Sequence, residues 1–126
     1  MSREIKFRAW DIHNEQMCEV PHINLKGKFG VMSCAKYTSS FVFEEVILEQ
    51  YTGLKAVLGV DVYEGDIVKF KVHKKKNPQG WQIGKLARVG AKFIIWSNWY
   101  HYDITNNIIE VIGNIHENPE LLEVQE

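Results

Sequence analysis

Apolar and polar residues alternate along most of the chain, and this pattern predicts β-strands more often than helices. Near the start, Ile5, Phe7 and Ala9 share one face of a strand while Lys6 and Arg8 share the other. The same reasoning predicts further strands at residues 17–20, 67–72, 81–89, 92–96 and 108–112. The sequence therefore predicts a mainly β protein.

Two segments depart from simple alternation. Residues 41–51 fit one face of a helix as well as a strand, but their β-branched content and the stop at Thr52-Gly53 favour a strand. Residues 118–122 read Asn-Pro-Glu-Leu-Leu, which is a capping residue, a proline at the first helical position and an acidic first turn. We therefore predict one short helical turn near the C-terminus.

The length of 126 residues suits one ordinary domain or two very small ones, and 45% apolar residues suffice for a core. The first residues are charged where a signal peptide would be apolar, and no apolar run approaches the roughly 20 residues that cross a bilayer. Cys18 and Cys34 have no second pair, so we expect buried or free thiols in a reducing cytosol, with one disulfide left open. These features predict a cytoplasmic protein without a membrane partner.

Three blocks of residues resemble the YopX family, small proteins found mostly in bacteriophages and prophages. The opening block is residues 5–11, the middle block is residues 50–55 with 63–68, and the closing block is residues 110–115 with 117–122. The resemblance implies a β fold with an SH3-like barrel that begins near Gly65-Asp66, in a protein of the bacterial host's cytoplasm. It implies no catalytic activity, because the biochemical function of the family is not established.

We accordingly expect an N-terminal β-unit at residues 1–50, coupled to a C-terminal SH3-like barrel unit at residues 51–126. A unit of that size seldom buries enough apolar surface alone, so we expect the two units to share a core, which could make them one domain, or the chain to oligomerise. One segment departs from the family pattern. Residues 56–60 read Ala-Val-Leu-Gly-Val where the family usually has a polar turn, so this apolar loop should be covered by the chain or by a partner.

The sequence contains no motif that is typical of a catalytic, cofactor-binding or metal site. Five histidines and two cysteines lack ligand spacing, and the segment 27–30 matches no phosphate-binding loop. Glu64 and Asp66 could point to the same side, but an aspartate in such a turn usually bonds to its local backbone. We therefore predict no enzyme activity, no cofactor and no metal.

Charge is distributed in two blocks. Residues 67–102 contain no Asp or Glu, whereas residues 103–126 contain six acids and no Lys or Arg. The basic, aromatic segment 69–102 could contact phosphates and stack bases. The candidate nucleic-acid residues are Lys71, Lys74, Lys75, Lys76, Lys85, Arg88, Trp81 and Trp99, with Trp96, Tyr100 and Tyr102 as further stacking candidates.

The same residues also suit roles that involve no nucleic acid. The aromatic side chains could be core residues or cross-strand pairs, the acidic tail could neutralise the basic segment, and aromatic grooves on SH3-like barrels also bind proline-rich peptides. Our leading hypothesis is a non-catalytic phage or prophage accessory protein that binds a protein partner, or itself. The alternative is a nucleic-acid-binding module that uses segment 69–102.

Overall fold

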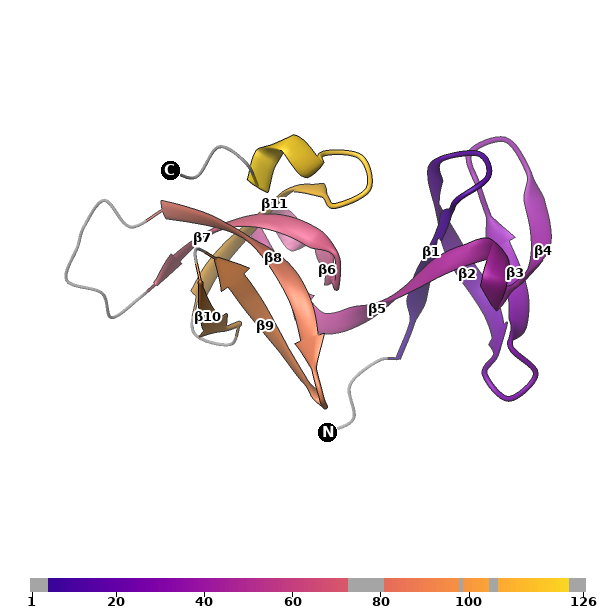
Figure 1. Cartoon of the computed structure of the whole chain (residues 1–126), viewed down its shortest axis with the longest axis horizontal. Helices are drawn as coiled ribbons and strands as arrows, with labels where there is room; N and C mark the ends of the chain where they lie inside the picture. Colours follow the sequence, from indigo (N-terminus) through magenta and orange to yellow (C-terminus); the bar gives the residue numbers. More distant parts are fainter. Residues whose placement is uncertain (1–4, 73–80, 98, 105–106, 123–126) are drawn as a thin grey trace. The chain divides into compact units, whose positions relative to one another are not determined.

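The computed structural model describes residues 5–72, 81–97, 99–104 and 107–122. The chain divides into two compact units, Met1–Tyr51 and Thr52–Glu126, and the described residues form two antiparallel sheets with three short 3-10 helices (Figure 1). The predicted mainly β class is confirmed. None of the helices in these ranges has the length and apolar character that a membrane span requires.

The first unit contributes the first five strands of a six-stranded sheet with the order β4-β3-β2-β1-β5-β6. Its elements are β1 (Phe7–Asp11), β2 (Gln16–Asn24), β3 (Phe29–Ser33), β4 (Thr38–Val42), η1 (Phe43–Glu45) and β5 (Val46–Lys55), the last of which runs on into the second unit. Ala9, Cys18, Met32 and Phe41 meet in its buried apolar cluster. The single strand predicted for residues 41–51 is confirmed only from residue 46 onward, where β5 begins. Residues 41–42 end β4, and residues 43–45 form η1.

Cys18 and Cys34 are joined by a disulfide with Cα atoms 4.6 Å apart, so the expectation of free thiols was wrong. The cause is the pairing of β2 with β3. This register places Glu19 opposite Ser33, and the adjoining residues on the two strands are the two cysteines. Strand register depends on contacts between residues that are far apart in the sequence, so the spacing of the two cysteines alone could not show that they are joined.

The second unit contains a five-stranded antiparallel sheet in the order β10-β9-β8-β7-β11. Its elements are the end of β5, then η2 (Val57–Gly59), β6 (Asp61–Tyr63), β7 (Asp66–Val72), β8 (Trp81–Val89), β9 (Lys92–Ser97), β10 (Tyr100–Asp103), β11 (Asn107–Asn114) and η3 (Pro119–Leu122). The predicted strands at 67–72, 81–89, 92–96 and 108–112 and the C-terminal helical turn are confirmed. Among the described strands, β10 and β11 are the two edges of this sheet, and no pairing closes it into a barrel.

The core of the second unit lies on one face of this sheet. Val68 and Phe70 of β7 pack with Leu86 of β8 and Ile95 of β9, and all four side chains are buried. The Tyr102 ring lies 5.1 Å from the Phe70 ring and extends the cluster to β10. The side chains on the other face of β7, β8 and β9 do not belong to this core cluster.

Candidate nucleic-acid interface

The outer face of the five-stranded sheet is set by strand alternation. Val68, Phe70 and Leu86 point inward and are buried. Successive side chains of a strand point to opposite faces, so Lys69 and Lys71 lie on the outer face of β7. Both are only partly buried. The polar residues of the alternating pattern that predicted β7, Lys69 and Lys71, thus lie on the surface.

Strand pairing brings aromatic side chains next to these lysines. Lys71 lies opposite Trp81 on β8, and Lys85 of β8 lies opposite Trp96 on β9. His101 of β10 faces Trp96 from the other side. We define the aromatic–lysine face by residues Lys69, Lys71, Trp81, Lys85, Trp96 and His101. Trp81 is 45% exposed and Trp96 is 42% exposed, which is unusual for the largest side chains of a small β protein.

Two contacts orient the tryptophan rings of this face. The Lys69 Nζ atom lies 5.1 Å from the centroid of the Trp81 ring, within the range of a cation–π interaction. The Trp96 and His101 rings are nearly parallel, with centroids 5.9 Å apart and an interplanar angle of 5°. From strand spacing, the backbone positions of the two tryptophans are about 14 Å apart. The face therefore offers two separate planar surfaces.

Acidic residues reach the same face from outside the basic segment. Glu110 of β11 lies opposite Lys69, and their side chains approach to 3.9 Å. Both partners are more than two-fifths exposed, so this pair contributes little to stability. Asp103 stands on the outer side of the edge strand β10, opposite Ile94. The sequence from 67 to 102 is free of acids, but the surface that it forms is not.

The structure separates the residues that the sequence suggested. Lys71, Trp81 and Lys85 lie on the aromatic–lysine face. Arg88 shares its side of β8 with buried Leu86, so it does not. Trp99, which is 91% exposed with φ of 72°, lies in the connection between β9 and β10. Lys74, Lys75 and Lys76 lie outside the described residues.

The remaining stacking candidates divide in the same way. Trp96 belongs to the face, whereas Tyr100 and Tyr102 occupy the other side of β10, opposite Ser97 and Ile95. For Tyr102 the core role is correct, because its ring packs on Phe70. His101 was not among the candidates, and Lys69 entered only as the start of the basic segment. Alternation marks Lys69 and Trp96 as outward residues, but only the pairing of β9 with β10 reveals His101.

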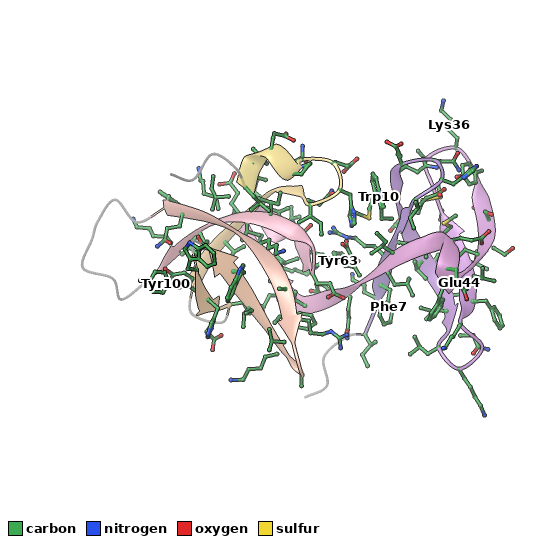
Figure 2. The ribbon with its side chains drawn as sticks, viewed as in Figure 1. Phe7, Trp10, Lys36, Glu44, Tyr63 and Tyr100 are labelled. Carbon is green, nitrogen blue, oxygen red and sulfur yellow. A yellow bond between two sulfur atoms is a disulfide. The ribbon has the colours of Figure 1, made fainter. Side chains whose placement is uncertain are left out.

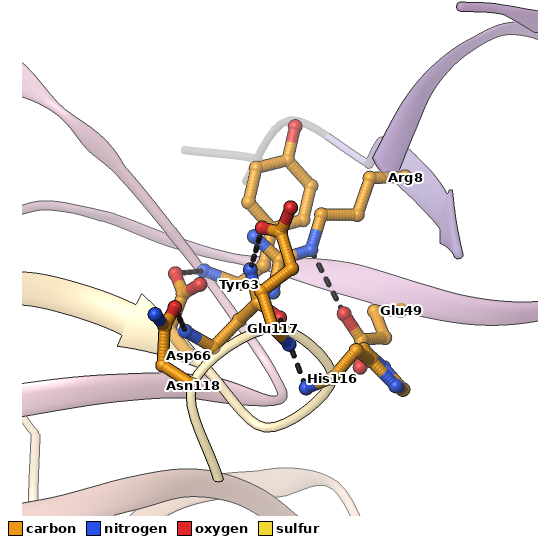
Figure 3. A network of polar contacts seen from close by, with 8 residues as sticks. Arg8, Glu49, Tyr63, Asp66, His116, Glu117 and Asn118 are labelled. Carbon is orange, nitrogen blue, oxygen red and sulfur yellow. Dashed lines mark hydrogen bonds and ion pairs between the residues drawn. The ribbon is translucent and has the colours of Figure 1, made fainter. Parts of the chain in front are cut away.

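One carboxylate of the middle block, that of Asp66, has a structural role. The Asp66 side chain is buried, and its Oδ2 atom accepts a hydrogen bond of 2.8 Å from the backbone N–H of Tyr63 (Figure 3). This is the turn chemistry that the sequence predicted. Within the described ranges, His, Cys, Asp and Glu side chains form no group of three or more that could hold a metal ion.

The other blocks that carry the family resemblance are also used for folding. Arg8 and Glu49 form a hydrogen-bonded ion pair of 2.8 Å between β1 and β5 (Figure 3). Gly65 donates its N–H to the Leu86 carbonyl at 2.8 Å and accepts a bond from the Ile115 N–H at 2.9 Å. Its φ of 87° requires glycine. These residues maintain turns and strand pairing.

The apolar loop at residues 56–60 is held at its base and exposed at its tip. The Ala56 N–H donates to the Val60 carbonyl at 2.6 Å, and Ala56 itself is buried. Leu58 is 99% exposed and has φ of 66°, a left-handed conformation that leucine rarely adopts. The prediction that this loop is covered by another part of the chain is wrong for Leu58.

Comparisons with known proteins identify a similar solved structure and a family. The crystal structure of protein EF1440 from Enterococcus faecalis is similar, with a TM-score of 0.61 and 27% sequence identity over 96% of this chain and 99% of that chain. A search of curated proteins finds no match. The family model described as YopX protein matches residues 6–123, nearly the whole length. The chain belongs to the YopX family, as its three sequence blocks indicated.

Proposed function

We propose that the protein is a non-catalytic binding module, and that its aromatic–lysine face binds single-stranded nucleic acid. The observation that carries this proposal is the cross-strand placement of two half-exposed tryptophans beside lysines, with Lys71 opposite Trp81 and Lys85 opposite Trp96. Bases stack on exposed aromatic rings, and lysines neutralise the phosphates between them. Both requirements are met on one face of one sheet.

A single strand suits this face better than a duplex. The major groove of DNA admits a helix or a two-stranded ribbon, and this face lies on a five-stranded sheet. Unstacked bases of a single strand can lie flat on Trp81 and Trp96, in the way that sheet aromatics of other RNA-binding modules receive bases. A plot of the logarithm of the binding constant against the logarithm of the salt concentration should have a slope of about −2. The face has three lysines, and each phosphate of a single strand that a lysine neutralises contributes about 0.7 to this slope.

The test is fluorescence anisotropy of labelled single-stranded DNA and RNA with the full chain at several salt concentrations. Trp81→Ala or Trp96→Ala should weaken binding about tenfold or more, because stacking contributes about 1–3 kcal/mol per base. Trp99→Ala is the matched control, since Trp99 is more exposed but lies in a connection outside this face. Lys85→Ala should reduce the salt slope by about 0.7, and Arg88→Ala, on the opposite side of β8, should not. No binding at low salt, or equal losses in the controls, would refute the proposal.

A second candidate, protein binding through the apolar loop at 56–60, is favoured by the exposure of Leu58. An exposed apolar side chain held in a strained conformation is typical of a contact site. Light scattering after size exclusion and pull-down from host lysate would test it with the wild type and Leu58→Ser. A partner or dimer that is lost in the variant supports this function, and a strict monomer that retains nothing contradicts it.

Three further features are proposed from the family resemblance rather than from geometry. They are an SH3-like arrangement of the second unit, a phage or prophage source, and action in the cytoplasm of the bacterial host. Each fits an accessory binding protein. Sequencing of the genes that surround this one would test the source directly, because a prophage origin requires neighbouring phage genes.

A further inference from the structure

The outer edge of the first unit is strand β4, which pairs only with β3 among the described strands. The N–H of Cys34 donates to the Tyr37 carbonyl at 2.8 Å, and the N–H of Phe43 donates to the Lys28 carbonyl at 3.1 Å. In an antiparallel pair, hydrogen-bonded positions alternate. The backbone groups of Thr38 and Ser40 therefore face away from β3.

This edge has few of the features that usually protect an exposed strand. Natural edges are blunted by charged residues, prolines or bulges. Strand β4 reads Thr-Ser-Ser-Phe-Val and pairs with β3 over five positions without a register shift. Two of its outward backbone groups are engaged locally: the Val42 N–H donates to the Glu45 side chain at 3.0 Å, and the Ser40 carbonyl accepts from the Ser39 hydroxyl at 2.9 Å. The amide N–H groups of Thr38 and Ser40 are available to a further strand.

A pocket of about 570 Å³ adjoins the same strand. Ser39 and Ser40 of β4 line it, together with Met32 of β3, Tyr37 of the turn, and side chains from the β1–β2 turn and η1. This volume is in the range of sites that receive a ligand group. An edge strand with a pocket beside it is the arrangement by which domains bind extended peptides: backbone bonds give affinity, and the pocket selects a side chain.

The lining of the pocket is acidic. Asp11, Glu44 and Glu45 contribute carboxylates, and none of the lining residues is Lys or Arg. Burial raises the pKa of Asp11, but hydrogen bonds from Asn14, Tyr37 and the local backbone outweigh it and lower the pKa, so this carboxylate is ionised at neutral pH. The lysine that precedes β4 in the sequence, Lys36 on the β3–β4 turn, extends away from the sheet (Figure 2).

We propose that β4 binds an extended basic peptide as an added strand, with a lysine or arginine side chain of the peptide in the acidic pocket. Alternate side chains of an added strand point to the same face of the sheet. One set would therefore lie toward the pocket, where Glu44 and Glu45 of η1 meet the cation. This site is in the first unit and is independent of the nucleic-acid face.

The test is selection from a displayed library of random peptides of about six to eight residues, the usual strand length, on the full chain. Selected peptides should contain lysine or arginine at alternate positions. Glu44→Gln should weaken their binding about tenfold and reduce this preference. Selection without enrichment of basic residues over the unselected library overturns the proposal.

The strand geometry has its own test. Ser40→Pro removes an outward N–H without removing a bond to β3, and edge strands tolerate proline at such positions. It should abolish binding of the selected peptides. If this variant fails to fold, N-methylation of alternate peptide amides tests the same bonds and should weaken binding about tenfold or more. Equal affinity of the methylated peptide contradicts strand addition. A concentration-dependent dimer lost in Ser40→Pro would instead identify a second copy of this chain as the occupant, which also contradicts the proposal.

Discussion

Reduction of the Cys18–Cys34 disulfide should destabilise the first unit substantially. The disulfide joins β2 to the end of β3 and closes a loop with a sequence separation of 16 residues. In the chain-entropy description, a loop of this length restricts the unfolded chain by about 3 kcal/mol. That is a large fraction of the stability of a small β-unit, because single domains are stable by only about 5–15 kcal/mol.

The assay is urea unfolding of oxidised and reduced wild type, followed by circular dichroism. Amide hydrogen exchange of β2 and β3 reports on the first unit separately, because each cooperative region opens with its own free energy. Reduction should lower the free energy of unfolding of these strands by about 3 kcal/mol. Cys34→Ser is the control: Cys34 is only half-buried, so the substitution removes the bond with little loss of packing.

Two results would refute this reasoning. If reductant leaves the unfolding of the wild type unchanged, the two cysteines are not joined in the purified protein. If reductant destabilises Cys34→Ser as much as the wild type, the effect does not arise from this disulfide. Mass spectrometry after alkylation separates these cases, since it counts the free thiols directly.

Three other predictions follow from single sites. Gly84→Ala should cost about 1–3 kcal/mol in urea unfolding, because its Cβ would lie 2.8 Å from the Trp96 carbonyl oxygen. Leu58→Gly should raise the free energy of unfolding by about 1 kcal/mol, because it removes left-handed strain and no packing. Burial raises the pKa of Asp11, but its hydrogen bonds hold the pKa below the ordinary value. The stability that ionised Asp11 contributes is therefore complete above about pH 4 and is lost as the pH falls through the folded pKa. Asp11→Asn should not show this loss when unfolding is followed in an acid titration.

Local patterns predicted much of the fold. Alternation located β7, β8 and β9 to within a residue or two, because each strand has one buried and one outer face. The Asn-Pro-Glu sequence predicted η3 for the same kind of local reason. Strand β10 was missed, since Tyr100 to Asp103 is too short to show a period and contains two tyrosines whose exposure differs.

The candidate faces could be predicted only in part. The sequence shows which side chains share a face of one strand, and this is enough for Lys69 and Lys71. It does not show which strands are neighbours. The pairing of β7 with β11 brings Glu110 to Lys69, and the pairing of β9 with β10 stacks His101 on Trp96. For the same reason, the disulfide and the pocket beside β4 were not predictable.

The blocks that identify the family and the residues of the aromatic–lysine face are different parts of the chain. Asp66 and Gly65 of the middle block hold a turn, and Arg8 pairs with Glu49 inside the first sheet. Trp81 and Trp96 lie between the middle and closing blocks, within the residues 6–123 that the family model matches. The residues that carry the family resemblance therefore support the fold. The choice of ligand must come from the surfaces that these turns support, so variants of Trp81 and Trp96 should lose binding while they keep the fold.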